Sequence, residues 1–180
     1  MIDEEQWLRN LMHAYGPETI KFIRLYTRNA SEAEDLLQEV FLKAFRARDS
    51  FRGDSSLRTW MWSITVRVCQ DFLRRQGRKP VRLVDEGLLE ALRRVPSASA
   101  ETEALQLLES GELLRMVQSL PNKYQTAIVL YYFQDLDIHE TAQALHITDT
   151  AVKSRLFRGR NELKKMLQAE GGRNPWTTRL

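Results

Sequence analysis

Residues 137–167, "DIHETAQALHITDTAVKSRLFRGRNELKKML", carry the pattern that decides the fold of this chain. Asp137, followed three residues later by Glu140, is a capping box, because each side chain can bond a free backbone N–H at a helix start. Thr148 is placed to cap a second helix. His146 stands at the turn position where Gly is usual, and His tolerates left-handed backbone better than a β-branched residue does. The stretch therefore predicts two short helices joined by a tight turn.

The second of these helices has an apolar face and a cationic face. Its apolar residues recur at three- and four-residue steps: Val152, Leu156, Gly159, Leu163 and Met166/Leu167. No acid follows Asp149 until Glu162, so the cations form a cluster of one sign. This pattern predicts a helix-turn-helix whose second helix lies in the DNA major groove, although a merely solvated helix face is the alternative. The candidate DNA contacts are Lys153, Ser154, Arg155, Phe157, Arg158 and Arg160.

The bulk composition is that of a soluble, helical protein. The chain has 180 residues, of which 28% are charged and 43% hydrophobic, so there is room for one or two small globular domains. Its net charge of +3 fits a polyanionic partner, and the basic residues gather at 74–82 and 153–165. Gly and Pro are scarce and no stretch alternates like a strand. We expect an all-α fold of two small helical domains joined by a flexible linker.

Several features indicate a cytoplasmic protein. The single cysteine, Cys69, excludes an internal disulfide framework and fits a reducing cytosol. No apolar run is long enough to span a bilayer, and the acidic start "MIDEE" is unlike a secretory signal. We therefore expect neither a membrane segment nor a targeting segment.

The first half of the chain carries two further helices with distinctive polar residues. Residues 31–48 predict a helix capped by Ser31 with Glu34, and residues 3–29 predict two segments split near Gly16-Pro17. After "FRGDSS", Ser55 or Ser56 can cap a helix in which aromatics alternate with cations. Rings stack on unpaired bases and cations follow phosphates, so this helix suits single-stranded nucleic acid. The residues concerned are Arg58, Trp60, Arg67, Arg74, Arg75, Arg78 and Lys79, with Trp60 or Trp62 expected in the core.

Taken together, these motifs resemble a bacterial RNA polymerase sigma factor of the extracytoplasmic-function (ECF) group. The strings are "SEAEDLLQEVFLKAFR", "FRGDSSLRTWMWSI", "DFLRR", "LPNKYQTAIVLYYFQDLDIHETAQAL" and "VKSRLFRGR", in the order and spacing of the family. The resemblance covers residues 5–80 and 110–167. It implies a protein that binds core RNA polymerase, directs it to promoters through −35 and −10 elements, and promotes strand opening.

The resemblance also implies roles for individual residues. In the family, the acidic-edged helix docks on the β′ clamp, which implies polymerase contacts by Asp35, Gln38 and Glu39. Binding of the opened −10 element is implied for Trp60 and for the loop Gln76 to Lys79. The −35 contacts are implied for Lys153, Ser154, Phe157 and Arg158. Two positions depart from the family pattern: Arg67 replaces a common Asn, which leaves the captured base open, and Ala151 replaces a usual Thr.

The expected organisation is a polymerase-clamp and −10 domain at 1–80, a linker at 81–105, a −35 domain at 106–170 and a tail at 171–180. The second domain should add helices at 104–119 and 121–135 before the helix-turn-helix. The linker residues suit either a plain tether or, as in the family, a segment that threads into the polymerase near its active site. The implied partners are core polymerase (β′ clamp and β flap), promoter DNA and an anti-sigma factor.

No enzymatic chemistry is expected. His13, His139 and His146 have no partner at metal-ligand spacing, and Cys69 lies mid-helix among apolar residues. We find no catalytic residues, metal ligands, cofactor motif or small-molecule substrate. The competing hypothesis is a stand-alone helix-turn-helix regulator of duplex DNA, but such a protein has no need of "DLLQE" or "FRG…TW".

Overall fold

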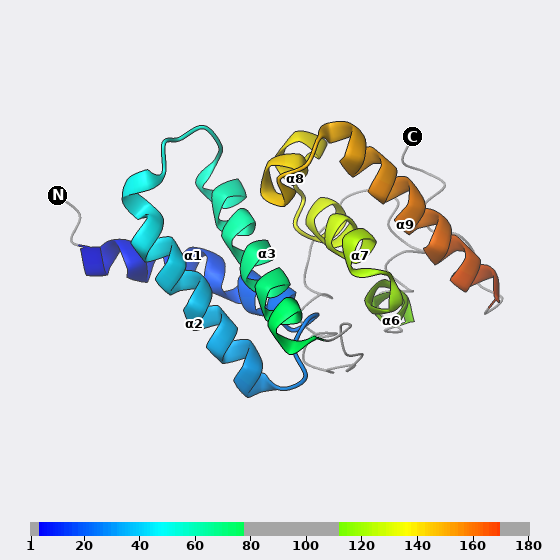
Figure 1. Cartoon of the computed structure of the whole chain (residues 1–180), viewed down its shortest axis with the longest axis horizontal. Helices are drawn as coiled ribbons and strands as arrows, with labels where there is room; N and C mark the ends of the chain where they lie inside the picture. The colour runs from blue at the N-terminus through cyan, green and yellow to red at the C-terminus, as the bar shows by residue number, and fades with distance from the viewer. Residues whose placement is uncertain (1–3, 78–111, 170–180) are drawn as a thin grey trace.

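The computed structural model describes residues 4–77 and 112–169, and every regular element within these ranges is helical (Figure 1). The first group of helices is α1 (Glu4–Ile23), α2 (Ala30–Ala47) with a short 3₁₀ turn (Arg48–Ser50), and α3 (Leu57–Gln76). The second group is α6 (Glu112–Ser119), α7 (Asn122–Ile128), a π-helical turn (Val129–Phe133), α8 (Ile138–Leu145) and α9 (Asp149–Ala169). The all-α prediction is confirmed. No helix in the described ranges is long and apolar enough to cross a bilayer.

Helices α1, α2 and α3 pack against one another around an aromatic centre. Phe22 and Trp62 meet edge to face with ring centroids 5.2 Å apart, and such pairs stabilise a core beyond their buried area. Trp62 is buried whereas Trp60 is only partly so, as the two-residue spacing predicts. Cys69 is also buried, and burial raises the pKa of its thiol, so it stays protonated and unreactive.

Two sequence predictions for this group were wrong in detail. Residues 4–23 form one helix that includes Pro17, rather than two segments split at Gly16-Pro17. A proline inside a helix costs about 3 kcal/mol, but the buried side chains of Leu11, Phe22 and Ile23 lie on both sides of it and favour one continuous helix. The cap of α2 also lies two residues earlier than predicted.

The observed cap of α2 uses Asn29 and Glu32 instead of Ser31 and Glu34. Glu32 N–H donates to Asn29 Oδ1 at 2.8 Å, and Glu32 Oε2 accepts from the N–H of Arg28 at 2.8 Å. Asn is as good a cap as Ser, and starting two residues earlier adds length to the helix. The predicted cap of α3 is confirmed, because Thr59 N–H donates to Ser56 Oγ at 3.0 Å.

In the second group, α9 packs against α6, α7 and α8, and the predicted helix-turn-helix is present. Asp137 and Glu140 form both bonds of the capping box, at 2.7 and 3.0 Å. His146 adopts a left-handed φ of 52°, and Thr148 Oγ1 accepts from the N–H of Ala151 at 3.2 Å. The predicted apolar face of α9 is buried at Val152, Leu156, Gly159, Leu163 and Leu167.

The helix predicted at 121–135 has an altered course. Pro121 is its cap, and after α7 the chain widens into the π-helical turn Val129–Phe133. Such turns are rare in helices and are frequently found at functional sites. Residues 104–111, the linker and the tail with Trp176 lie outside the described residues.

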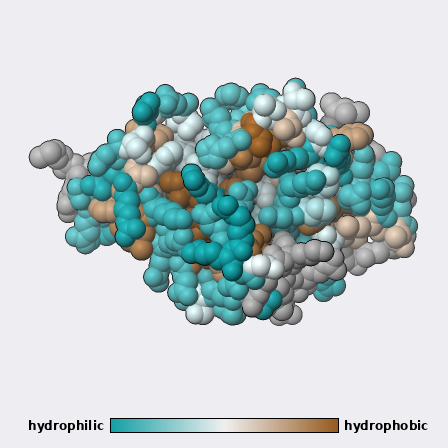
Figure 2. All heavy atoms as spheres, in the orientation of Figure 1, coloured by the Kyte–Doolittle hydropathy of each residue, from teal (hydrophilic) through white to brown (hydrophobic). Residues whose placement is uncertain are grey.

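The two groups of helices touch each other through α3 and α8 (Figure 1). The buried apolar residues of both groups belong to one cluster. The surface in Figure 2 is mainly hydrophilic, with apolar residues in separate patches. Among the described residues, the large hydrophobic side chains that remain exposed are Met12, Leu42 and Phe157.

Candidate functional site

The outer edge of α2 presents a compact polar surface with one apolar residue in it. Asp35, Gln38, Glu39 and Leu42 are three, four and seven residues apart, so they share one face of the helix. Asp35 and Gln38 are exposed, Glu39 is partly buried, and 51% of Leu42 is exposed. The opposite face buries Val40 and other core residues. We call these four residues the α2 edge.

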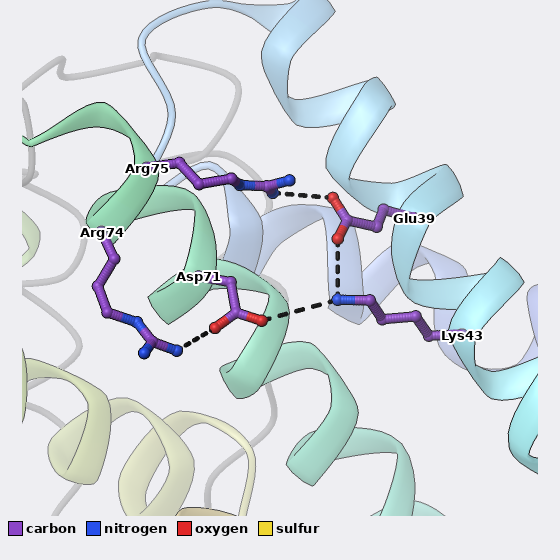
Figure 3. Close-up of polar contacts among 5 residues, drawn as sticks. All are labelled: Glu39, Lys43, Asp71, Arg74 and Arg75. Carbon is purple, nitrogen blue, oxygen red and sulfur yellow. Dashed lines mark hydrogen bonds and ion pairs between the residues drawn. The ribbon is translucent and has the colours of Figure 1, made fainter.

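Glu39 ties the α2 edge to α3 through a network of charges (Figure 3). Its carboxylate accepts from Lys43 at 2.9 Å and from Arg75 at 3.0 Å. Asp71 lies 3.7 Å from the ammonium of Lys43 and also accepts from Arg74. These five side chains line an open hollow of ≈ 490 Å³ between the two helices. Exposed ion pairs add little stability, so the network matters mainly because it orients Arg74 and Arg75.

The network also sets the protonation of Glu39. Partial burial acts to raise the pKa of this carboxyl, but the hydrogen bonds from Lys43 and Arg75 outweigh burial, and the pKa lies below its ordinary value. Glu39 is therefore ionised at neutral pH. It can form charge-assisted hydrogen bonds with a cationic partner.

The exposed face of α3 carries an aromatic ring and two guanidinium groups in a row. Trp60, Arg67 and Arg74 are seven residues apart, which is nearly two full turns, so they form a line with steps of about 10 Å. Arg67 and Arg74 are exposed, and Trp60 is partly exposed with its ring centroid 5.2 Å from that of Phe51. Arg75 and Gln76 lie at the end of the same helix. We call this row the α3 face.

Arg58 does not belong to the α3 face. It precedes Arg67 by nine residues, which places it on the opposite side of the helix. Its guanidinium donates to the backbone carbonyl of Gln134 in the second group of helices. The structure thus separates Arg58 from the other cations of this predicted set and places it against Gln134, directly after the π-helical turn.

The exposed face of α9 presents Lys153, Ser154, Phe157 and Arg158, all near the start of the helix. Phe157 is 58% exposed, which is unusual for so large an apolar side chain. Arg155 and Arg160 are only partly exposed, and Arg160 donates to the Tyr132 hydroxyl at 3.4 Å. The predicted DNA-contacting set is therefore brought together, with these two arginines at its sides.

Arg158 also has a neighbour that the sequence did not reveal. It hydrogen-bonds the hydroxyl of Tyr124 on α7, and this bond, with a smaller effect from nearby Lys123, lowers the pKa of the phenol. Both residues line a hollow of ≈ 310 Å³ together with Lys164 and Lys165. Arg158 is therefore exposed at the surface of α9 but lies beside the phenol of Tyr124 on α7.

Comparisons with known proteins agree with this arrangement. The family model for sigma-70 region 2 matches residues 11–79, and that for sigma-70 region 4 matches residues 110–163. RNA polymerase sigma-H factor of Pseudomonas aeruginosa is 30% identical over 88% of this chain and 84% of its own length. The ECF sigma-E factor of Escherichia coli is 35% identical over 77% of this chain and 75% of its own length. The ECF sigma factor SigW of Bacillus subtilis is 34% identical over 78% of each. The chain is an ECF sigma factor.

Two solved structures share the fold of this sigma factor. The structure of CnrH in complex with the cytosolic domain of CnrY has a TM-score of 0.65 at 21% identity, and covers 92% of this chain and 90% of its own. Sigma factor RpoE from Bartonella quintana, in complex with the anti-sigma factor NepR, has a TM-score of 0.66 at 21% identity. The match covers 90% of this chain and 97% of the RpoE chain. The region 2 match also disfavours the stand-alone regulator hypothesis.

The α2 edge and the α3 face of this sigma factor both lie within the region 2 match, and α9 lies mostly within region 4. Arg78 and Lys79, predicted for the −10 strand, fall outside the described residues. No role was predicted from the sequence for Leu42, Lys43, Asp71 or Tyr124, although Leu42 lies off the apolar face of its helix. A signal existed for Leu42, which is an apolar residue on the polar side of a helix. None existed for Tyr124, whose contact with Arg158 spans two helices.

Proposed function

We propose that three surfaces divide the work of this sigma factor. The α2 edge binds the β′ clamp of core RNA polymerase, the α3 face binds the opened −10 strand, and the start of α9 reads the −35 element. The observation that carries this assignment is the separation of chemistries over three helices. The α2 edge has an ionised acid beside an exposed leucine, the α3 face has a ring in line with cations, and the start of α9 has exposed cations. Each combination suits a different partner.

The α3 face suits a single strand. A base stacked on Trp60 would place the following phosphates along Arg67 and Arg74, because the steps of about 10 Å cover roughly three nucleotides of a stacked strand. Arg75 would join them once it leaves Glu39, and Gln76 extends the row. Base–aromatic stacking is worth about 1–3 kcal/mol for each base.

The start of α9 suits the major groove. Arg158 and Lys153 can donate to guanine O6 and N7, and Phe157 can pack on a thymine methyl group. Ser154 can bond either a base edge or a phosphate. The partly covered Arg155 and Arg160 fit phosphate contacts at the sides of the groove better than base contacts.

The same proposal extends to domains, partners and location. The domain limits are residues 1–80 and 106–170, with the linker at 81–105 and the tail at 171–180. The β flap would contact the second domain. An anti-sigma factor would be a further partner, because RpoE is in complex with the anti-sigma factor NepR and CnrH is in complex with the cytosolic domain of CnrY. The protein acts in the cytoplasm and catalyses no reaction by itself.

The polymerase assignment is tested by Glu39→Gln. This change removes the charge without changing the shape of the side chain, so folding should survive while co-purification with core enzyme falls. Glu5→Gln is the matched control, because Glu5 also pairs with a cation four residues away and lies on α1. Equal recovery of core enzyme by the two variants would refute the assignment of the α2 edge.

A further inference from the structure

Helices α7 and α9 pack closely together beside Arg158 (Figure 1). At Gly159, the next residue, an added Cβ atom would lie 3.0 Å from Ile128 Cγ1 and 3.4 Å from Tyr124 Cβ. The glycine therefore lets the two helices approach without a shift of these neighbours. Gly159 and Ile128 are buried, which fixes both backbones at this point. The position of Tyr124 on α7 is thereby set relative to Arg158.

The side chain of Tyr124 is held from two sides. It belongs to the first turn of α7, where its N–H donates to the carbonyl of Pro121 at 2.8 Å. The ammonium of Lys123 lies over its ring, 5.0 Å from the centroid, which is a cation–π contact. Its hydroxyl accepts a hydrogen bond from Arg158. A tyrosine has only two side-chain torsions to order, so it is a more rigid partner than the arginine that it bonds.

The bond to Tyr124 leaves Arg158 able to read a base. A guanidinium has five N–H donors, of which the hydroxyl takes one, and a bidentate contact with guanine O6 and N7 uses two. Glu162, the nearest acid along α9, is four residues further on and accepts from Lys165 at 2.9 Å. Tyr124 can therefore orient the guanidinium without occupying the donors that a base needs.

We propose that Tyr124 is a positioning residue for Arg158 in recognition of the −35 element, and that its hydroxyl holds the guanidinium in the orientation that bonds a guanine. This inference rests on the proposed function of the start of α9. A free arginine side chain has many rotamers, and ordering it on DNA lowers affinity. Because Tyr124 orders Arg158 beforehand, less of this entropy is lost on binding. The same bond disfavours rotamers that would reach a phosphate or a different base, so base discrimination depends on it too.

Tyr124→Phe tests the proposal, because it removes the hydroxyl and keeps the ring under Lys123. Holoenzyme containing the variant is titrated with the preferred −35 sequence and with sequences that each carry one changed base pair. Loss of one hydrogen bond should reduce discrimination roughly two- to twelve-fold at the base pair that Arg158 reads. Arg158→Ala identifies that base pair. Discrimination elsewhere in the element should be unchanged, and Tyr124→Phe should have no further effect in the Arg158→Ala background.

Tyr132→Phe is the matched control. The Tyr132 hydroxyl also accepts from an arginine of α9, since Arg160 donates to it at 3.4 Å. Arg160 is assigned to phosphate contact, so this variant should keep every base preference of wild type. Urea unfolding midpoints of both tyrosine variants are measured in parallel, and both should match the wild-type midpoint.

Three results would overturn the positioning role of Tyr124. They are unchanged discrimination by Tyr124→Phe, an equal loss of affinity on every −35 sequence, and a further loss in the Arg158→Ala background. An equal loss joined to a lower unfolding midpoint would assign Tyr124 to folding alone. A base-specific loss for Arg158→Ala beside unchanged Tyr124→Phe would reject this inference and leave the proposed function standing. Absence of any base-specific loss for Arg158→Ala would reject the proposed reading of the −35 element by Arg158, and the inference with it.

Discussion

Leu42 gives the most discriminating test of the polymerase-binding surface, because it is an exposed leucine in the middle of an otherwise polar edge. Full burial of a leucine side chain is worth about 1.5–3 kcal/mol. Because 51% of Leu42 is exposed in the free chain, about half of that free energy, ~0.75–1.5 kcal/mol, remains to be gained on docking. Leu42→Ala should therefore weaken binding to core polymerase roughly three- to thirteen-fold.

Met12→Ala is the matched control for this substitution. Met12 is similar in size, is 45% exposed, and belongs to α1 rather than to α2. Both changes should leave the free energy of unfolding within about 0.5 kcal/mol of wild type, as is usual at exposed positions. The dissociation constant is measured by titrating core polymerase with labelled sigma factor. Unchanged affinity for Leu42→Ala, or an equal loss for Met12→Ala, would refute the reasoning.

Three further predictions concern α9, the core and pH. Arg158→Ala should weaken the DNA-binding free energy of the holoenzyme by about 1–3 kcal/mol at the preferred −35 sequence and relax discrimination between bases there. An equal loss of binding on every DNA sequence would identify a phosphate contact instead. Thr141→Val should leave the free energy of unfolding unchanged or raise it by up to about 1 kcal/mol, because the buried Thr141 hydroxyl has no hydrogen-bond partner among the described residues. A clearly lower free energy of unfolding, measured by urea denaturation, would contradict this. Since the pKa of Glu39 is lowered on folding, its stabilising effect is full above the ordinary carboxyl value near ~4.3 and is lost as pH falls through the lower folded value. The difference in unfolding free energy between wild type and Glu39→Gln should follow that course, and a constant difference in acid would exclude it.

Local signals in the sequence predicted most of the helices. The capping box at Asp137, the cap at Ser56 and the buried face of α9 depend on residues within one or two turns of each other, so spacing alone reveals them. The predicted break at Pro17 was wrong. Proline disfavours the interior of a helix, but the apolar side chains of α1 pack against α2 and α3 and outweigh that local preference. Asn29 was missed because two equally good caps stood two residues apart.

The site was predicted one face at a time. Residues on a single helix, such as Lys153 and Phe157, were grouped correctly because helical periodicity places them together. Contacts between helices were not predictable in this way. Nothing in the spacing indicates that Arg75 pairs with Glu39, that Tyr124 bonds Arg158, or that Arg58 turns toward Gln134. Those contacts depend on how the helices pack, which one sequence does not specify.

The central claim is that the chain acts only together with core RNA polymerase, and promoter opening measures this most directly. Duplex promoter DNA is treated with permanganate in the presence of the free chain, of core polymerase, or of both. One small helix-turn-helix buries too little surface for tight binding alone, since specific interfaces need roughly 1,000–2,500 Å². We predict reactive thymines near the −10 element only when both proteins are present, with weak, salt-sensitive binding by the free chain. Tight sequence-specific footprinting by the free chain, unchanged by polymerase, would contradict the account.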